Sequence, residues 1–380
     1  MMKKKKILVL IESLSGGGAE KVLSTVVRYI NQEYCNIMVC VLSGGGVYEK
    51  DIAGHVDIHV VLKNEASYKG LWKIWYKFMY YLVYCWLPSW LVYMLFIPKG
   101  NDVEVAFVEG YATKLLAASN NKRAKKIAWV HADLISQPWT LQKGVFKDIE
   151  DERRTYRKYD KIVCVSKSVE KVMNEEYGLT STVTIYNPVD TLNIIRKGKE
   201  CSSFNVDYTR FNIVSVGRMA QEKGYDILLP IIQRVTQTCP NVHLWLIGTG
   251  AEETALKKQT ADLGIEGNVT FTGFLNNPYS LMSKMDLFVC SSRAEGFSLV
   301  IAESMVLGVP VISTSCSGPK ELIGCNEYGI LCNTYEELER EILNAVKIRT
   351  VHKGVPPIVD INETMKKVSE LLGLKVAITM

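Results

Sequence analysis

The sequence lacks the cysteine and charge patterns that mark several classes of protein. Its ten cysteines never form a C-x-x-C pair, and several lie in apolar runs such as KIVCVS, so we expect buried thiols in a reducing compartment. No basic stripe interleaved with aromatic residues is present, and the net charge is only +5. A nucleic-acid groove is therefore not indicated, whereas nucleotide phosphates and anionic lipids both fit this charge.

Several ligand-binding signatures are also missing. The run SGGGAE at 15–20 has neither the spacing of a dinucleotide fingerprint nor the G-K-[ST] ending of a P-loop, and GTG at 248–250 fails the same test. The chain has no D-x-D pair and no cluster of histidine and cysteine ligands. The sequence therefore predicts neither NAD nor ATP chemistry, no cofactor, and a site that works without a metal ion.

The N-terminus has some features of a signal peptide but not all of them. Lysines precede the apolar run ILVLI, but this run is short and meets Glu12 and a glycine turn where a cleavage site would be needed. We therefore expect a first β-strand. With 380 residues, 48% of them hydrophobic and 22% charged, the chain is typical of a globular protein with two domains.

Short apolar runs alternate with helix-length segments, which predicts an α/β protein with parallel sheets covered on both faces. The alternation pauses in a polar stretch, KGKECSSFNVDYTR, before it restarts. We expect Rossmann-like domains over 1–188 and 189–355, with their strand ends facing one another across a cleft. The expected strands are 7–12, 37–42, 57–61, 103–108, 126–130 and 161–166 in the first domain, and 211–217, 243–248, 269–273, 287–291 and 309–314 in the second.

One segment, 78–97, carries no charge and is rich in tyrosine and tryptophan. Its length suits a transmembrane helix, but Pro88 divides it and the sheet resumes directly afterwards. We favour an insertion over about 69–98 that touches the membrane, because three lysines recur every four residues beside aromatic side chains. A helical hairpin buried in the core is the alternative. The lysines are Lys69, Lys73 and Lys77.

The strongest chemical signal is the pair Glu295 and Glu303, which follows an apolar strand and opens a helix. Ionised carboxylates only accept hydrogen bonds, so one suits the hydroxyls of a sugar and the other those of a ribose. Gly296 permits a tight turn before a helix N-terminus suited to a pyrophosphate. The alternative is a glutamate favoured by the helix dipole and an unrelated second one. The N–H groups of this N-terminus belong to Phe297, Ser298 and Leu299.

A cationic pair lies in VGRMAQEKG, just past the first strand of the second domain. Arg218 and Lys223 would reach the C-terminal edge of the sheet, where phosphates bind. A guanidinium fork and a lysine point charge can together neutralise a leaving diphosphate. A solvated pair of loop residues is the alternative.

Two further candidates lie at strand ends of the first domain. His131 ends the strand 126–130 and would face the cleft, although a lone histidine is more often structural. Asp133 is a candidate base or polar contact for an acceptor, and Glu20 is a second candidate contact for the acceptor. The glycines Gly17 and Gly18 open a helix and offer a backbone site for an anion or an acceptor, although such turns are often structural.

Together, SGGGAE, WVH at 129–131, VSKS, NPVD, GRMAQEKG and EGFSLVIAE resemble the retaining glycosyltransferases of family 4, GT4, which have the GT-B fold. The resemblance covers nearly the whole chain in order. It implies that Arg218 and Lys223 contact the donor diphosphate, that Glu303 binds the ribose hydroxyls, and that Glu295 with the following backbone holds the transferred sugar. His131 would lie beside the reacting face of that sugar, and Gly17 and Gly18 near the phosphates and the acceptor.

The resemblance also implies a mechanism without an enzyme nucleophile. The departing phosphate oxygen would help to deprotonate the acceptor hydroxyl on the same face, so that catalysis rests on positioning and on charge stabilisation. A last helix at about 361–374, within 356–380, would return to the first domain.

The glycine loop followed by Glu20, the aromatic insertion and WVHAD are most similar to bacterial transferases that build capsule or O-antigen on a lipid-diphosphate carrier. We therefore expect a nucleotide-sugar donor, UDP-hexose or UDP-N-acetylhexosamine, and a lipid-linked saccharide acceptor, with the enzyme cytoplasmic and peripheral on the inner face of the cell membrane. Two alternatives stay open: a sugar-nucleotide epimerase, and a catalytically silent subunit that serves as a scaffold.

Overall fold

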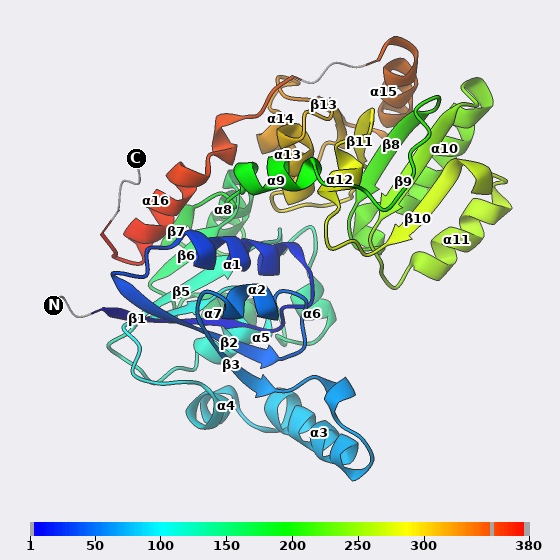
Figure 1. Ribbon diagram of the computed structural model, residues 1–380. Helices are drawn as coiled ribbons and strands as arrows, with labels where there is room; N and C mark the ends of the chain where they lie inside the picture. Colours follow the sequence, from blue (N-terminus) through cyan, green and yellow to red (C-terminus); the bar gives the residue numbers. More distant parts are fainter. Residues whose placement is uncertain (1–3, 350–352, 376–380) are drawn as a thin grey trace. The chain divides into compact units, whose positions relative to one another are not determined.

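The computed structural model describes residues 4–349 and 353–375. The chain divides into two compact units: the first runs to Pro188 and resumes at Asn362, and the second runs from Val189 to Ile361. Each unit contains one sheet whose strands pair in parallel, with helices packed around it (Figure 1). The predicted α/β class is confirmed.

The sheet of the first unit has seven strands in the order β3-β2-β1-β4-β5-β6-β7. The strand order reverses between β1 and β4, which pair directly, so this is the switch point at which parallel α/β sheets bind ligands. The strands are β1 (Lys5–Ile11), β2 (Cys35–Ser43), β3 (Asp57–Leu62), β4 (Val103–Ala106), β5 (Lys125–Val130), β6 (Lys161–Cys164) and β7 (Thr182–Thr184). The helices α1 (Gly18–Tyr29), α2 (Glu49–Ala53), α5 (Tyr111–Leu116), α6 (Trp139–Gln142), α7 (Ile149–Tyr156) and α8 (Lys167–Glu175) follow these strands.

The sheet of the second unit repeats this topology with six strands in the order β10-β9-β8-β11-β12-β13. Its switch point lies between β8 and β11. The strands are β8 (Phe211–Val216), β9 (Val242–Ile247), β10 (Val269–Gly273), β11 (Leu287–Cys290), β12 (Val311–Thr314) and β13 (Ile330–Cys332). The helical segments are α9 (Thr191–Gly198), η3 (Gln221–Lys223), α10 (Tyr225–Thr238), α11 (Glu253–Asp262), η4 (Glu266–Asn268), α12 (Tyr279–Met282), α13 (Leu299–Val306), α14 (Ser317–Ile323), α15 (Tyr335–Ile348) and η5 (Pro357–Val359).

The strands form where near-continuous apolar runs are covered on both faces, as in β1, whose last five residues are all buried. All eleven expected strands are present. Three of them, at 103–108, 161–166 and 309–314, are two residues shorter than expected at one end. The strands β7 and β13 were not expected, because three residues are too few for a periodic signal.

The last helix, α16 (Ile361–Leu371), packs on the first unit (Figure 1). Val368 and Leu372 lie among apolar side chains of β1 and α1, including Ile7 and Leu23. At the C-terminus of the helix, Lys5 Nζ donates to Leu372 O over 2.9 Å. Lysines that donate to the last carbonyls also complement the helix dipole.

The aromatic insertion lies between β3 and β4 and is broken into short pieces. After η1 (Glu65–Ser67) come α3 (Leu71–Tyr81), the π-helical turn η2 (Leu82–Trp86) and α4 (Ser89–Phe96). None of the helices in the described ranges is both long and apolar enough to cross a membrane. Lys69 precedes α3, so the expected face of three lysines on one helix is wrong; only Lys73 and Lys77 lie on it.

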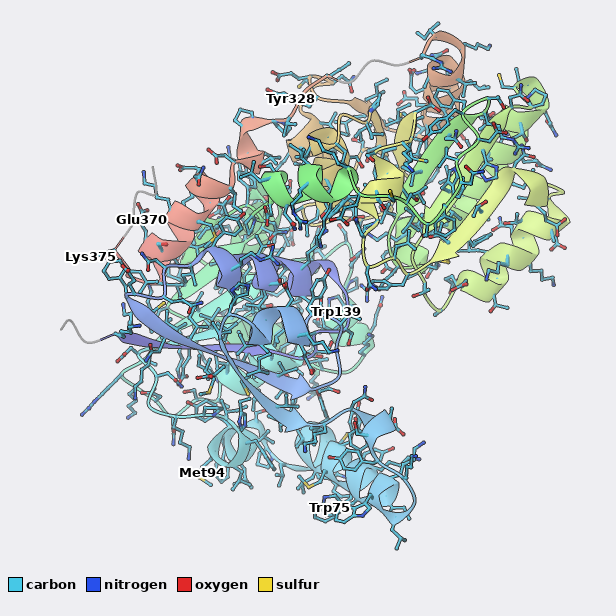
Figure 2. All side chains as sticks on the ribbon, in the orientation of Figure 1. Trp75, Met94, Trp139, Tyr328, Glu370 and Lys375 are labelled. Atoms are coloured by element: carbon cyan, nitrogen blue, oxygen red, sulfur yellow. The ribbon has the colours of Figure 1, made fainter. Side chains whose placement is uncertain are left out.

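The insertion is not buried in the core, so the alternative of a buried hairpin is wrong. Trp75 and Met94 lie on its outer side, and Trp72 is two-thirds exposed (Figure 2). Its exposed large apolar side chains are Leu71, Trp72, Ile74, Trp75, Phe78, Tyr80, Tyr81, Trp86, Trp90, Met94 and Leu95.

The ten cysteines are all free thiols, but they are not all buried. Those in strands, such as Cys40 and Cys164, are buried as expected, and burial raises the pKa of the Cys40 thiol to about 12. The expectation is wrong for three in helical turns and loops, where the chain is not covered on both faces. These are Cys85, Cys201 and Cys325.

Candidate functional site

Two loops meet at the switch point of the second unit, where β8 and β11 end side by side. Gly224, at the start of α10, has φ 65°, and a Cβ there would lie 2.2 Å from the Ser291 carbonyl oxygen, so only glycine allows this approach. Ser291 Oγ donates to Lys223 O over 2.9 Å. The approach places Lys223 against the loop that carries Glu295.

Lys223 and Glu295 form the central ion pair of this edge. Lys223 Nζ donates to Glu295 Oε1 over 2.6 Å, and Ser292 Oγ donates to the same oxygen over 2.7 Å. The side chains of the two ionic partners are only 19% and 12% exposed. A pair so enclosed is screened little by water, and it orients both groups tightly.

Two opposing effects act on the Lys223 ammonium group. Burial, the largest single effect, lowers the pKa of Lys223, but the charge of Glu295, with smaller effects from Tyr225, Cys290 and the hydrogen bond to Glu295, raises the pKa above its ordinary value. Lys223 therefore stays charged at physiological pH. A fixed positive charge at a sheet switch point suits a phosphate ligand.

The loop after Glu295 leads into α13 through a left-handed residue. Ser298 is the N-cap with φ 66° and ψ 72°, and its buried Oγ has no hydrogen-bond partner within residues 4–349 and 353–375. Phe297 is buried beneath it, and Leu299 begins the helix. The strained serine with an unused hydroxyl is consistent with a ligand that binds at this helix start.

The remaining candidates of the second unit divide by exposure. Glu303 lies one turn into α13 and is buried. Arg218 is 75% exposed, and its guanidinium lies 3.7 Å from Glu222 Oε1 instead of joining the ion pair of Lys223. The structure thus brings Lys223 and Glu295 together, whereas Arg218 would need to change its rotamer to join them.

The glycine loop of the first unit begins α1, with Gly17 as N-cap and Gly18 as the first helical residue. As a glycine, Gly17 has no side chain with which to cap the helix. The Glu20 carboxylate folds back over this start, because a Cβ on Gly17 would lie 2.4 Å from Glu20 Oε2. A glutamate three residues after the N-cap commonly stabilises a helix start, so an anion at this position would have to displace Glu20.

His131 directly follows β5 and is held there by one hydrogen bond of its ring and one of its own backbone N–H. Its ring Nε2 lies 3.0 Å from the Phe107 carbonyl oxygen, and its backbone N–H donates to Glu109 Oε2 over 2.9 Å. Nε2 therefore carries the proton, and the buried Nδ1 is an acceptor without a partner in the described part of the chain. Burial lowers the pKa of His131 to about 4. The neutral ring can accept a hydrogen bond from a hydroxyl but is a weak base.

The Asp133 carboxylate accepts hydrogen bonds from its own loop. Its Oδ1 accepts from the backbone N–H groups of Ile135 and Ser136, each over 3.0 Å, and its Oδ2 accepts from Ser136 Oγ over 2.7 Å. These bonds are the pattern of a side chain that caps a turn. The structure therefore favours a role in shaping the loop after β5 over a role as a base.

Two carboxylates that we did not select lie at the switch point of the first unit. Glu12 directly follows β1, and its Oε1 accepts from Tyr111 N over 2.7 Å. Glu109 follows β4 and is buried. Burial raises the pKa of both Glu12 and Glu109, and hydrogen bonds from backbone N–H groups offset part of that rise. Glu12 directly follows β1 and Glu109 lies three residues after β4, and these positions close to strand ends were the signal that could have found them.

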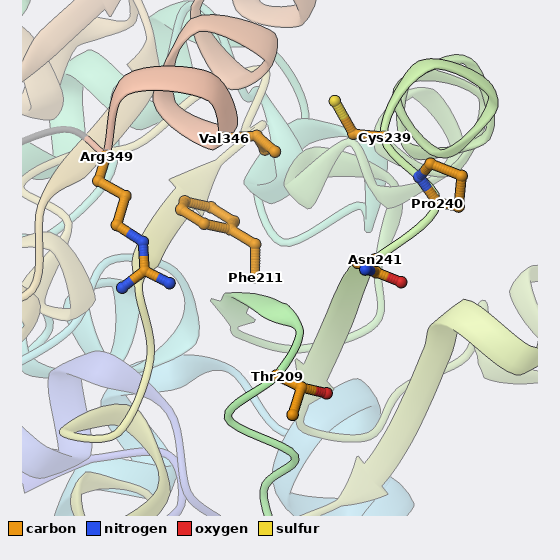
Figure 3. A pocket seen from close by; sticks show the side chains of 7 residues that line it. All are labelled: Thr209, Phe211, Cys239, Pro240, Asn241, Val346 and Arg349. Carbon is orange, nitrogen blue, oxygen red and sulfur yellow. The ribbon is translucent and has the colours of Figure 1, made fainter.

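Two other features of the described residues do not mark a ligand site. No three histidine, cysteine, aspartate or glutamate side chains of residues 4–349 and 353–375 gather as a metal site would require. A cavity of about 310 Å³ lies at the N-terminal ends of β8 and β9, lined by Phe211, Asn241 and Arg349 among others (Figure 3). It is at the opposite edge of the sheet from Lys223 and Glu295.

The two parallel α/β units, each with a polar cluster at its switch point, define the class of GT-B proteins. A crystal structure of Anabaena Alr3699/HepE in complex with UDP-glucose has the same fold, with a TM-score of 0.72, 21% sequence identity, and coverage of 97% of this chain and 99% of that chain.

Comparison with protein families specifies the class. The family described as Glycosyltransferase Family 4 matches residues 16–192, and the family described as Glycosyl transferases group 1 matches residues 199–353. The two matches together cover most of the chain, and the chain belongs to the family 4 glycosyltransferases. The predicted resemblance is confirmed.

Individual relatives agree with this assignment. The N-acetylgalactosamine-N,N'-diacetylbacillosaminyl-diphospho-undecaprenol 4-alpha-N-acetylgalactosaminyltransferase of Campylobacter jejuni is 24% identical over 92% of this chain and 93% of its own length. The O-antigen biosynthesis glycosyltransferase WclY of Escherichia coli is 32% identical over 41% of this chain and 44% of its own. The chain spans 53%, 34% and 59% of the lengths of the first three curated relatives it matches.

Proposed function

We propose that this protein transfers a hexose or an N-acetylhexosamine from a UDP-sugar to a lipid-diphosphate-linked saccharide, with retention of anomeric configuration, in the synthesis of a bacterial surface polysaccharide. The observation that carries the proposal is the enclosed Lys223–Glu295 ion pair at the switch point of the second unit. The solved relative with bound UDP-glucose and the Campylobacter relative, whose name specifies a diphospho-undecaprenol acceptor, support the choice of substrates.

The second unit supplies the donor chemistry in this proposal. Lys223, joined by Arg218 after a change of rotamer, neutralises the diphosphate, while the start of α13 receives a phosphate oxygen. Glu295 and Glu303 accept hydrogen bonds from hydroxyls of the transferred sugar and of the ribose. Because Lys223 is paired with Glu295 before the donor arrives, the diphosphate competes for a cation that is already oriented.

The reaction itself needs no protein nucleophile. The bond between the anomeric carbon and the diphosphate oxygen breaks, and a new bond forms between that carbon and the acceptor oxygen on the same face. The proton of the acceptor hydroxyl passes to the departing phosphate oxygen, and UDP leaves. His131, neutral and with Nδ1 as an acceptor, orients a substrate hydroxyl without removing its proton.

The test is a panel of nucleotide sugars, measured by thermal shift and by release of UDP or GDP, with and without lipid-diphosphate saccharides and without added metal. We expect one UDP-sugar to bind and to release UDP only with an acceptor. Release of UDP without any acceptor would favour the epimerase. Donor binding without turnover would favour the scaffold.

The exposed side of the insertion supports a peripheral position on the inner face of the cell membrane. Tryptophans there are half or more exposed, among them Trp72, Trp75 and Trp86, and Lys73 and Lys77 flank them on α3. Aromatic and lysine side chains together suit the headgroup layer of a bilayer that contains anionic lipid.

Flotation with vesicles of phosphatidylglycerol and phosphatidylcholine tests this position. We expect the chain to float with the anionic vesicles, and the double variant Trp75→Ser/Trp86→Ser to remain in solution. Tyr208→Ser removes an exposed aromatic ring of the second unit and serves as the control. Equal flotation of the double variant and the wild type would contradict the membrane contact.

A further inference from the structure

The aromatic rings of the insertion form two groups of different chemistry, which meet where the rings of Tyr80 and Tyr81 pack edge-on, 5.9 Å apart. One group contains Trp75, Phe78, Tyr81 and Trp86, whose neighbouring ring centroids lie 5.6 to 5.8 Å apart. The other contains only tyrosines and continues beyond the insertion. This tyrosine row runs from Tyr68 to Tyr76 (5.3 Å), Tyr80 (6.4 Å), Tyr84 (4.7 Å) and Tyr111 (4.8 Å).

The spacing of the residues explains why the tyrosines form a row. Tyr76, Tyr80 and Tyr84 are four apart, so they lie along one face of the helix. The row continues through the π-helical turn η2, and π turns are rare and often mark functional sites. At its end Tyr84 packs on Tyr111, the first residue of α5.

The row ends at the switch point of the first unit. The backbone N–H of Tyr111 donates to Glu12 Oε1, and the phenol of Tyr111 donates to the carbonyl oxygen of Val83 in η2. Burial, and then the negative charge of Glu12, raise the pKa of both Tyr84 and Tyr111 far above physiological pH. The phenols near Glu12 are therefore neutral.

We infer that the tyrosine row and Glu12 bind the saccharide of the acceptor, with Glu12 accepting a hydrogen bond from one of its hydroxyls. Aromatic rings cover the apolar faces of sugar rings, phenols and carboxylates pair with sugar hydroxyls, and ligands bind at the strand ends of such sheets. A lipid-facing surface needs no carboxylate, and a core would not leave Tyr80 41% exposed. This inference rests on the proposed function, because it names the residues that hold its acceptor.

The adjacent residues Tyr80 and Tyr81 provide a matched pair of variants. Both are exposed tyrosines of α3, at 41% and 49%. Tyr80 belongs to the row, whereas Tyr81 stacks on Trp86 and meets the row only edge-on, at Tyr80. We therefore compare Tyr80→Ala, Tyr81→Ala and Glu12→Gln, the last of which keeps an oxygen for the Tyr111 N–H. Near-ultraviolet circular dichroism checks that each variant is folded.

The probes are methyl glycosides of glucose, galactose, N-acetylglucosamine and N-acetylgalactosamine, observed by saturation-transfer NMR, with UDP binding followed separately. We expect one or more glycosides to bind the wild type, and about tenfold weaker binding in Tyr80→Ala and Glu12→Gln. Binding to Tyr81→Ala should stay within about twofold of the wild type, because the Tyr81 ring stacks on Trp86 and touches the row only at the edge of Tyr80. UDP binding should be unchanged in all three variants.

Three results would overturn the inference: no glycoside binds the wild type, Tyr80→Ala and Glu12→Gln bind as the wild type does, or Tyr81→Ala loses binding equally. The donor measurements separate the inference from the proposed function. If the wild type binds no nucleotide sugar while the glycosides still distinguish Tyr80 from Tyr81, the proposed transfer fails and the saccharide site stands.

Discussion

The two switch points have the same strand topology but opposite electrostatic character. In the second unit a charged lysine, Lys223, is enclosed with Glu295. In the first unit Glu12 and Glu109 lie at the equivalent strand ends, where burial raises the pKa of each, beside a neutral His131. The charged edge of the second unit suits an anion, and the edge of the first unit suits neutral hydroxyl groups, although both have the same strand topology.

The largest effect should come from removing Lys223, the cation at the switch point of the second unit. Lys223→Ala should lower kcat about 10²- to 10³-fold, because a preorganised positive charge on the leaving diphosphate is lost. The control is Lys257→Ala, which removes an exposed lysine from a 2.7 Å pair with Glu253 on α11. Steady-state UDP release measures both, and an equal loss in the two variants would mean that Lys223 has no special role.

Removing the anion of the same pair should separate binding from turnover. Glu295→Gln should destabilise the free protein by about 3 kcal/mol, since Lys223 is left enclosed without its partner. UDP should then raise the melting temperature more in Glu295→Gln than in the wild type, because the diphosphate replaces the lost carboxylate, while turnover falls. Differential scanning fluorimetry with UDP measures this. An unchanged UDP shift would show that Lys223 does not meet the diphosphate.

At the switch point of the first unit, lowering the pH should reveal that His131 is neutral in the folded protein. Since burial lowers the pKa of His131 from 6.5 to about 4, the unfolded chain takes up a proton first as the pH falls. Stability is then lost between about pH 6.5 and pH 4, by up to about 3 kcal/mol.

Urea denaturation of His131→Gln across this range tests the assignment. The variant should lose less stability in acid than the wild type, whereas His55→Gln, at an exposed site of the same unit, should follow the wild type. Parallel curves for all three proteins would contradict a buried neutral His131.

The smallest effect should concern the left-handed start of α13. Ser298→Gly should change the free energy of unfolding by no more than about 1 kcal/mol, because glycine relieves the strain of φ 66° and adds chain entropy to the unfolded state. In contrast, Ser304→Gly, within α13, should destabilise by at least about 1 kcal/mol. If Ser298→Gly is the more damaging change, the serine side chain itself holds the loop.

The sequence predicted the polar cluster at the switch point of the second unit better than the cluster at that of the first unit. Lys223 and Glu295 lie in short motifs directly after strands, and the strand ends of a parallel sheet share one edge, so their proximity follows from local pattern. Arg218 was predicted on the same ground, but its rotamer is free to pair with Glu222. Asp133 and Glu20 were chosen for their chemical type, and the structure uses both near their own backbone.

The tyrosine row was beyond prediction from the sequence. Tyr84 and Tyr111 are 27 positions apart, and only the π turn and the packing of the insertion near α5 bring their rings within 4.8 Å. The exposure of the insertion was favoured from its lysines and aromatic residues, but where its short helices break was not.

The sequence by itself determined the α/β class, the two sheets and the motifs at their strand ends, because apolar periodicity and turn residues act over a few positions. Only the tertiary structure decided which polar groups lose water. Burial gives His131 its acceptor nitrogen, raises the pKa of Glu12, and encloses the Lys223–Glu295 pair. Those properties depend on neighbours that are distant in the chain, because desolvation is a sum over everything packed around a group.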